Sequence, residues 1–251
     1  MARRRSGVVA LVVVAALGYA LVAGCDGRAV PAPDRPVPKA SATLPPSGSA
    51  TGLSKPVTPP PAAPQSLPFV DVAAAKAAVA GLPVKGRAPL TDYDRAAFGV
   101  AWSDTNDNGC DTRNDILRRD LRDTRVADCV VLAGILDDPY SGRRVRFVRG
   151  PVTSLDVQID HVVALANAWQ TGAAYWTSAK RERFANDRRN LLAVRGDLNL
   201  QKRDGDAATW LPPRKEFRCT YVAMQVLTKQ RYGLWVTSAE KAAMQRILAS
   251  C

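Results

Sequence analysis

The 251-residue chain contains a single histidine, His161. One histidine cannot build a multi-histidine metal site, so zinc protease motifs such as His-Glu-x-x-His are excluded. No two of the five cysteines have Cys-x-x-Cys spacing, which argues against a zinc site of that kind. His161 is therefore either a core imidazole satisfied by packing or a lone general base.

The first 24 residues contain no acidic residue. Arg3, Arg4 and Arg5 precede an apolar run over residues 8–23, the pattern of an export signal. The run ends in Val-Ala-Gly before Cys25, which resembles the lipobox of bacterial lipoproteins. We expect residues 1–24 to be a signal peptide and Cys25 to carry lipid, which would anchor the exported protein on the outer side of the cell membrane. An ordinary cleaved signal, giving a secreted protein, and an uncleaved anchor are the alternatives.

Residues 25–68 hold 12 of the 18 prolines, with alanine, serine and threonine between them. Such a segment cannot bury a core, and we expect a disordered, extended tether. The folded part then covers residues 69–251, a normal size for a single domain.

Four cysteines remain after Cys25: Cys110, Cys129, Cys219 and Cys251. An even number in an exported chain indicates disulfides, and three pairings are possible. We favour Cys110 with Cys129 and Cys219 with Cys251, because each closes a short local loop.

The formal net charge is +12, and without the signal residues it is +9. This excess indicates a polyanionic partner: nucleic acid, anionic lipid or a cell-wall polymer. Between Lys180 and Arg218 there are 11 basic and 6 acidic residues. Charge alone does not choose among these partners, and no protein partner can be inferred.

Hydrophobic periodicity and turn residues predict a helix-rich α+β domain. A hairpin is expected where an apolar, β-branched run and an alternating basic and apolar run flank a turn at residues 137–142. The expected strands cover residues 129–136, 143–148, 156–161 and 191–194. The expected helices cover residues 72–80, 93–102, 113–121, 162–170, 178–185, 197–203, 215–231 and 238–249.

A polar loop begins at Asp104. Asp104, Asn106, Asn108, Gly109 and Asp115 occupy positions 1, 3, 5, 6 and 12 of an EF-hand calcium loop, with aspartate in place of the final glutamate. An Asn/Gly turn held by a disulfide accounts for the same residues. A Ca²⁺ site at this loop is therefore one of two interpretations.

The residues after His161 complete a recognisable motif. Asp160 and His161 end an expected strand, Asn190 precedes a second one, and Asn199 and Lys202 lie at i and i+3 on an expected helix. This order resembles the HNH endonuclease superfamily, and within it the C-terminal domain of GmrSD type, over a core motif of residues 156–206. The resemblance implies a ββα-metal fold holding one divalent ion.

Carried over to this sequence, the resemblance makes His161 the general base that activates a water molecule. Asp160 and Asn199 become the metal ligands, Asn190 positions the loop that bears His161, and Lys202 is a supporting charge near the ion or the phosphate. Oxygen ligands suit Mg²⁺, with Mn²⁺ as the alternative. Asn199 replaces the final histidine of the His-Asn-His motif from which the family takes its name. The implied activity is hydrolysis of phosphodiester bonds in DNA, or also RNA, with low sequence specificity.

Other interpretations remain open for the same residues. Asp160 alone could be a helix N-cap, and isolated asparagines are most often turn or cap residues. We expected Asp160 and His161 to reach one ion only if the strand breaks at Val162, because successive strand residues face opposite sides. A non-catalytic exported module that binds nucleic acid or wall polymer is the alternative function, and a toxin-like nuclease is a further one.

Overall fold

The computed structural model describes residues 70–251. The predicted signal peptide, the lipid-bearing Cys25 and the tether of residues 25–68 lie outside this part. Within residues 70–251, no helix is both long enough and apolar enough to cross a membrane.

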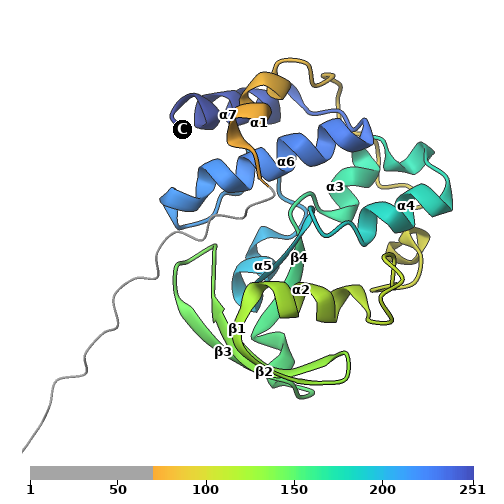
Figure 1. Ribbon diagram of the computed structural model, residues 1–251. Coiled ribbons are helices and arrows are strands. Elements are labelled where there is room, and N and C mark those ends of the chain that lie inside the picture. The colour runs from red at the N-terminus through yellow and green to blue at the C-terminus, as the bar shows by residue number, and fades with distance from the viewer. Residues whose placement is uncertain (1–69) are drawn as a thin grey trace, which may run out of the picture. The chain divides into compact units, whose positions relative to one another are not determined.

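The fold is α+β, as predicted, with two small antiparallel sheets among helices (Figure 1). Helices α1, α6 and α7 pack together at one end, the sheet β1-β2-β3 lies at the other, and β4 and α5 lie between them (Figure 1). The α-helices are α1 (Val72–Val79), α2 (Thr112–Asp120), α3 (Leu165–Gln170), α4 (Ser178–Ala185), α5 (Gly196–Lys202), α6 (Arg218–Tyr232) and α7 (Ser238–Ala249). The strands are β1 (Leu121–Ala127), β2 (Val130–Asp137), β3 (Arg144–Val148), β4 (Val157–His161) and β5 (Leu191–Arg195). Short 3-10 helices cover Arg95–Phe98, Thr153–Leu155, Ala173–Tyr175 and Lys215–Phe217.

Strands β4 and β5 form a two-stranded antiparallel sheet between two hydrophobic cores, although helices α3 and α4 separate them in sequence. Val157 and Ile159 of β4 pack with α2 and the three-stranded sheet, whereas Leu192 and Val194 of β5 pack toward α6. Helix α5 follows β5 without a loop. The structure therefore contains a strand-strand-helix unit at the position of the predicted motif.

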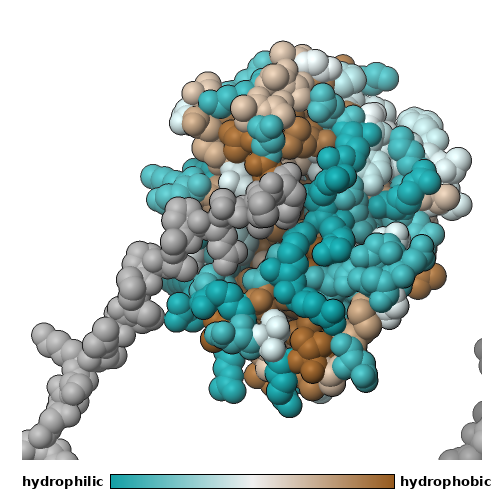
Figure 2. Space-filling view, viewed as in Figure 1, coloured by the Kyte–Doolittle hydropathy of each residue, from teal (hydrophilic) through white to brown (hydrophobic). Residues whose placement is uncertain are grey.

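Most charged side chains are exposed or half-buried, but a few, among them Lys202, Lys229 and Glu240, are buried. On the face shown in Figure 2, hydrophilic residues cover the middle of the described part, and hydrophobic residues are visible toward both ends. The apolar sides of the helices are thus used mainly in packing between elements.

One strand was not predicted. β1 is mostly polar and exposed, because it is an edge strand whose outer face meets solvent, and its pairing with β2 is interrupted by register shifts. Such a segment lacks the apolar alternation that identifies a half-buried strand. It lies beside the predicted hairpin, which the structure contains as β2 and β3.

Two predicted helices differ from the structure. The helix expected over residues 93–102 is only a 3-10 turn, Arg95–Phe98, because Gly99 and Trp102 adopt positive φ angles of 85° and 62°. The helix expected from Val162 begins at Leu165 instead. The backbone N–H groups of Val162 and Val163 are bonded to Asn190, which keeps this segment out of the helix.

Two disulfides link Cys110 to Cys129 and Cys219 to Cys251, the pairings favoured from the sequence. The second joins the start of α6 to the last residue of the chain, over a separation of 32 residues. It therefore fixes the end of α7 against α6.

Replacing Cys219 and Cys251 together by serine should lower the free energy of unfolding by about 3 kcal/mol, because a loop of this length constrains the unfolded chain. Urea denaturation of the variant and the parent would measure the difference. An unchanged unfolding midpoint would contradict the stabilising role of this disulfide.

Candidate active site

The free edge of strand β4 borders a cavity of about 650 Å³. In the described residues β4 pairs only with β5, so its other edge has no neighbouring strand. Residues 158–161 of β4 all line the cavity, together with Asn199 from α5. Asp160 and His161 therefore meet at one cavity although they lie on opposite faces of the strand. Strand β4 ends at His161, so the strand breaks at Val162 as expected, and the cavity lies along the strand edge.

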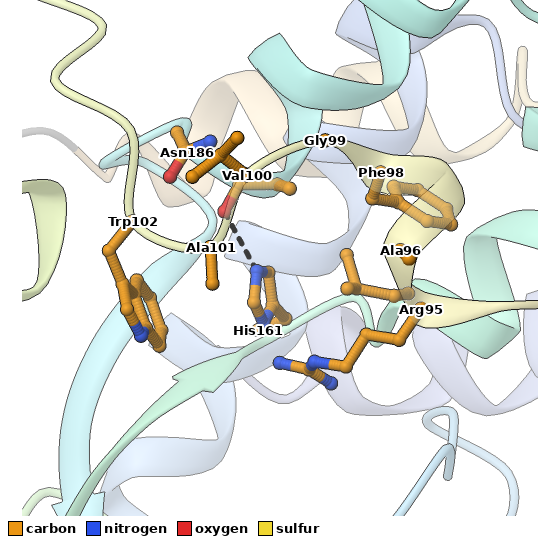
Figure 3. A pocket seen from close by; sticks show the side chains of 11 residues that line it. Arg95, Ala96, Phe98, Gly99, Val100, Ala101, Trp102, His161 and Asn186 are labelled. Carbon is orange, nitrogen blue, oxygen red and sulfur yellow. Dashed lines mark hydrogen bonds between the residues drawn. The ribbon is translucent and has the colours of Figure 1, made fainter.

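His161 is buried beside Trp102, with ring centroids 5.9 Å apart and the rings nearly parallel. Its Nε2 lies 2.8 Å from the carbonyl oxygen of Ala185 (Figure 3). A carbonyl can only accept, so Nε2 carries the proton and Nδ1 holds the lone pair. Burial, with a smaller effect from the charge of Arg95, lowers the pKa of His161 to about 4 against the opposing effect of the Ala185 hydrogen bond. The imidazole is therefore neutral near pH 7.

Asp160 is held by two buried side chains. Its Oδ1 accepts from Nζ of Lys202 at 2.8 Å, and its Oδ2 accepts from the hydroxyl of Tyr140 at 2.5 Å. Burial and the charge of Asp160 raise the pKa of Tyr140 well above its usual value, so the hydroxyl remains a donor. The orientation of the carboxylate is thus fixed by protein groups.

Lys202 contacts the Asp160 carboxylate from the side of the core. Its side chain is fully buried, and Nζ also donates to the carbonyl oxygen of His161 at 2.8 Å. It does not line the cavity at β4, so its charge neutralises Asp160 from inside the core. An ammonium in this position supports the carboxylate and does not reach a phosphate in the cavity.

Asn190 ties the two strands together just beyond His161. Its Oδ1 accepts from the N–H of Val163 at 2.8 Å, and its Nδ2 donates to the carbonyl oxygen of the same residue at 3.1 Å. Asn190 is fully buried, so these bonds are protected from water. They fix the chain where it leaves β4, in the way the resemblance implies.

Asn199 lies one turn into α5 and donates from Nδ2 to Oε1 of Gln158 at 2.9 Å. The first residue of α5 must be glycine, because a Cβ on Gly196 would lie 2.0 Å from the carbonyl oxygen of Leu155. With Nδ2 engaged, Oδ1 of Asn199 is the atom that can accept or ligate. Asn199 is thereby held at the same cavity as Asp160.

The chemistry of these donors fits one divalent cation. Each carboxylate oxygen of Asp160 accepts one hydrogen bond, from Tyr140 or Lys202, and keeps a further lone pair, and Asn199 offers Oδ1. Mg²⁺ is often held by one or two carboxylates, with phosphate and water oxygens completing the shell. Residues 70–251 contain no cluster of three or more His, Cys, Asp or Glu able to hold a metal. The protein would therefore supply only part of the ligand shell.

Sequence reasoning missed three arginines of this site. Arg95, Arg113 and Arg203 line the cavity with Asp160 and His161. Arg95 belongs to a 3-10 turn far from the motif in sequence, and Figure 3 shows its side chain beside His161. Only Arg203, directly after the helix, could have been found from its spacing. The cavity thus combines two carboxylates, Asp160 and Asp204, and a neutral imidazole with three arginines.

Comparison with known proteins agrees with this motif. The family described as GmrSD restriction endonucleases, C-terminal domain, matches residues 111–247, more than half of the chain. The chain belongs to this family. A relative from Arthroderma benhamiae, named only as an uncharacterized secreted protein, is 39% identical over 180 residues, which cover 70% of this chain and 84% of the relative. No solved structure matches the chain.

Membership of the GmrSD C-terminal family makes the chain a member of a nuclease family. The match contains β4, β5 and α5, and hence Asp160, His161, Asn190, Asn199 and Lys202. Arg95 and Trp102 precede the matched segment. The walls of the site next to His161 thus come partly from residues outside the family match.

The polar loop before α2 of this GmrSD-type domain is closed by its own hydrogen bonds. Asp104 accepts from the N–H groups of Asn106, Asn108 and Gly109, and Asp115 accepts from the side-chain amides of Asn106 and Asn108. A turn in which both carboxylates accept hydrogen bonds from the loop itself accounts for this geometry. Calcium binding remains an expectation from the loop spacing.

Proposed function

We propose that the protein is a metal-dependent HNH-type endonuclease that hydrolyses phosphodiester bonds of DNA. The observation that carries the proposal is the meeting of His161, Asp160 and Asn199 at one cavity along the edge of β4. Family membership supports the reaction class. RNA has the same phosphodiester chemistry and is the alternative substrate.

In this proposal His161 accepts a proton from the attacking water. The hydrogen bond from Nε2 to Ala185 fixes the ring and leaves Nδ1 as the basic atom. The water oxygen bonds to phosphorus while the P–O bond to the leaving 3′ oxygen breaks. A neutral imidazole is available for this step at pH 7 because burial disfavours its charged form.

Asp160 and Asn199 would hold one divalent cation, Mg²⁺ or Mn²⁺. Such an ion supplies electrostatic stabilisation of the phosphate oxygens. Lys202 and Tyr140 keep Asp160 in place. Because Lys202 already neutralises Asp160, we expect the protein to bind the metal weakly before a phosphate adds its own charge.

Arg95, Arg113 and Arg203 would attract the phosphate backbone into the cavity. Contacts between arginine and phosphate are independent of base sequence and weaken with salt. We therefore propose low sequence specificity.

We also propose that the protein is exported and that Cys25 carries a lipid anchor. The basic and apolar first 24 residues support export, as do the two disulfides and the secreted relative. The lipobox-like residues before Cys25 support the anchor. The tether would then hold the nuclease domain away from the membrane.

The test is incubation of the purified protein with supercoiled plasmid and Mg²⁺. We expect nicked and then linear DNA, complete loss of cleavage with excess chelator, and recovery when Mg²⁺ or Mn²⁺ is restored. Retention of DNA without cleavage under any divalent cation would instead establish the binding module. Cleavage that persists in chelator would contradict metal dependence.

A further inference from the structure

A second cavity, of about 310 Å³, lies on the other side of His161 (Figure 3). Its walls are mostly apolar, and most of them come from residues 95–102, before the family match. Phe98, Trp102 and Leu165 line it, and Val100, also in its wall, is 74% exposed. Its volume is at the small end of ligand pockets.

One buried acceptor in this wall is unsatisfied. Asn186 is 2% exposed, and its Nδ2 donates to the carbonyl oxygen of Glu182 at 3.0 Å. This bond leaves Oδ1 as the free acceptor, and none of the described residues hydrogen-bonds it. A buried acceptor without a partner is unfavourable, but this atom has almost no exposed surface, so a ligand in the cavity could bond to it only if the wall moved.

The two cavities meet at His161. They share Arg95, Trp102, His161 and Leu165, so a group in the smaller cavity is adjacent to a phosphate held in the larger one. An aromatic and aliphatic wall matches a flat ring that has apolar faces. All standard nucleobases have this character.

We propose that the smaller cavity holds the base of a nucleotide next to the scissile phosphate, so that the enzyme prefers single-stranded nucleic acid. This inference rests on the proposed function. A base in a duplex is stacked and paired, and it must be flipped out at an energetic cost before it can enter a cavity of this kind. A single strand offers its bases without that cost.

The test uses variants whose larger side chains fill the cavity. Their binding to nucleic acid is measured in the presence of a chelator, so that the result does not depend on turnover. Ala101 and Ala96 line the cavity and are exposed, so Ala101→Phe and Ala96→Phe should fold normally. The probes are a single-stranded DNA oligonucleotide and a base-free deoxyribose-phosphate oligomer of the same length. Ala179→Phe, on the exposed surface of α4 and outside both cavities, is the matched control.

We expect each filled variant to bind the oligonucleotide about 5- to 150-fold more weakly than wild type, the effect of losing one stacked base. Binding of the base-free oligomer, and both affinities of Ala179→Phe, should be unchanged. Equal wild-type affinity for both probes, no binding of either, or filled variants that match wild type would overturn the inference.

A cleavage assay separates this inference from the proposed function. Wild type should cut a single strand faster than the duplex of the same sequence, and Ala101→Phe should reduce that difference. Equal cleavage of both substrates would overturn the base cavity and leave the nuclease assignment intact. No cleavage of any substrate, with base-dependent binding retained, would overturn the nuclease assignment alone.

Discussion

Replacing His161 with glutamine should lower the rate of DNA cleavage by a factor on the order of 10² to 10⁴, the usual contribution of a general base. The amide of glutamine can still donate to the carbonyl oxygen of Ala185, so the fold should be retained. It has no basic nitrogen to accept a proton from water. Because His161 is the one histidine in the sequence, no second imidazole can replace it.

Steady-state cleavage of plasmid at saturating Mg²⁺ would measure the loss, with thermal unfolding as the check on folding. Tyr175→Ala is a suitable control, because this exposed ring lies outside both cavities. It should cleave at the wild-type rate. If His161→Gln cleaves within a few fold of wild type while folded, His161 is not the base.

Much of this site could be predicted because it is local in sequence. Strands β4 and β5 and helix α5 lie within about 50 residues, and their apolar pattern and polar ends are visible without a structure. Pairing the two strands places Asn190 opposite Val162, next to Val163, which its side chain binds. The end of the strand at His161 could be predicted, but alternation along a strand does not reveal that its other edge is free.

The rest depends on tertiary packing. Arg95 and Trp102 reach His161 from a loop about 60 residues earlier, and no spacing rule connects them. Tyr140 looked like part of a turn, yet its hydroxyl binds Asp160. The resemblance predicts Lys202 as a supporting charge near the ion or the phosphate, but it does not predict that the side chain is buried. Its burial becomes evident only when α5 is packed against β4.

The burial of Lys202 leads to a second large expected effect, on the stability of the protein. Lys202→Met should lower the free energy of unfolding by about 3–5 kcal/mol, because it leaves the carboxylate of Asp160 buried without its counter-charge. Methionine keeps most of the apolar length of lysine, so lost packing is a minor part of the change. Chemical denaturation would measure it. Lys76→Met, at an exposed position of α1, should change stability by less than about 0.5 kcal/mol.

The double variant distinguishes a charge effect from a packing effect. Asp160→Asn removes the uncompensated charge and keeps an oxygen that can accept from Tyr140. Adding it to Lys202→Met should therefore raise stability above that of Lys202→Met alone, a positive coupling in a double-mutant cycle. If the two losses simply add, the pair is not coupled and Asp160 is stabilised by other groups. Because Asp160→Asn also removes the proposed carboxylate ligand, the more stable double variant should still fail to cleave DNA, which separates the stability of this site from its chemistry.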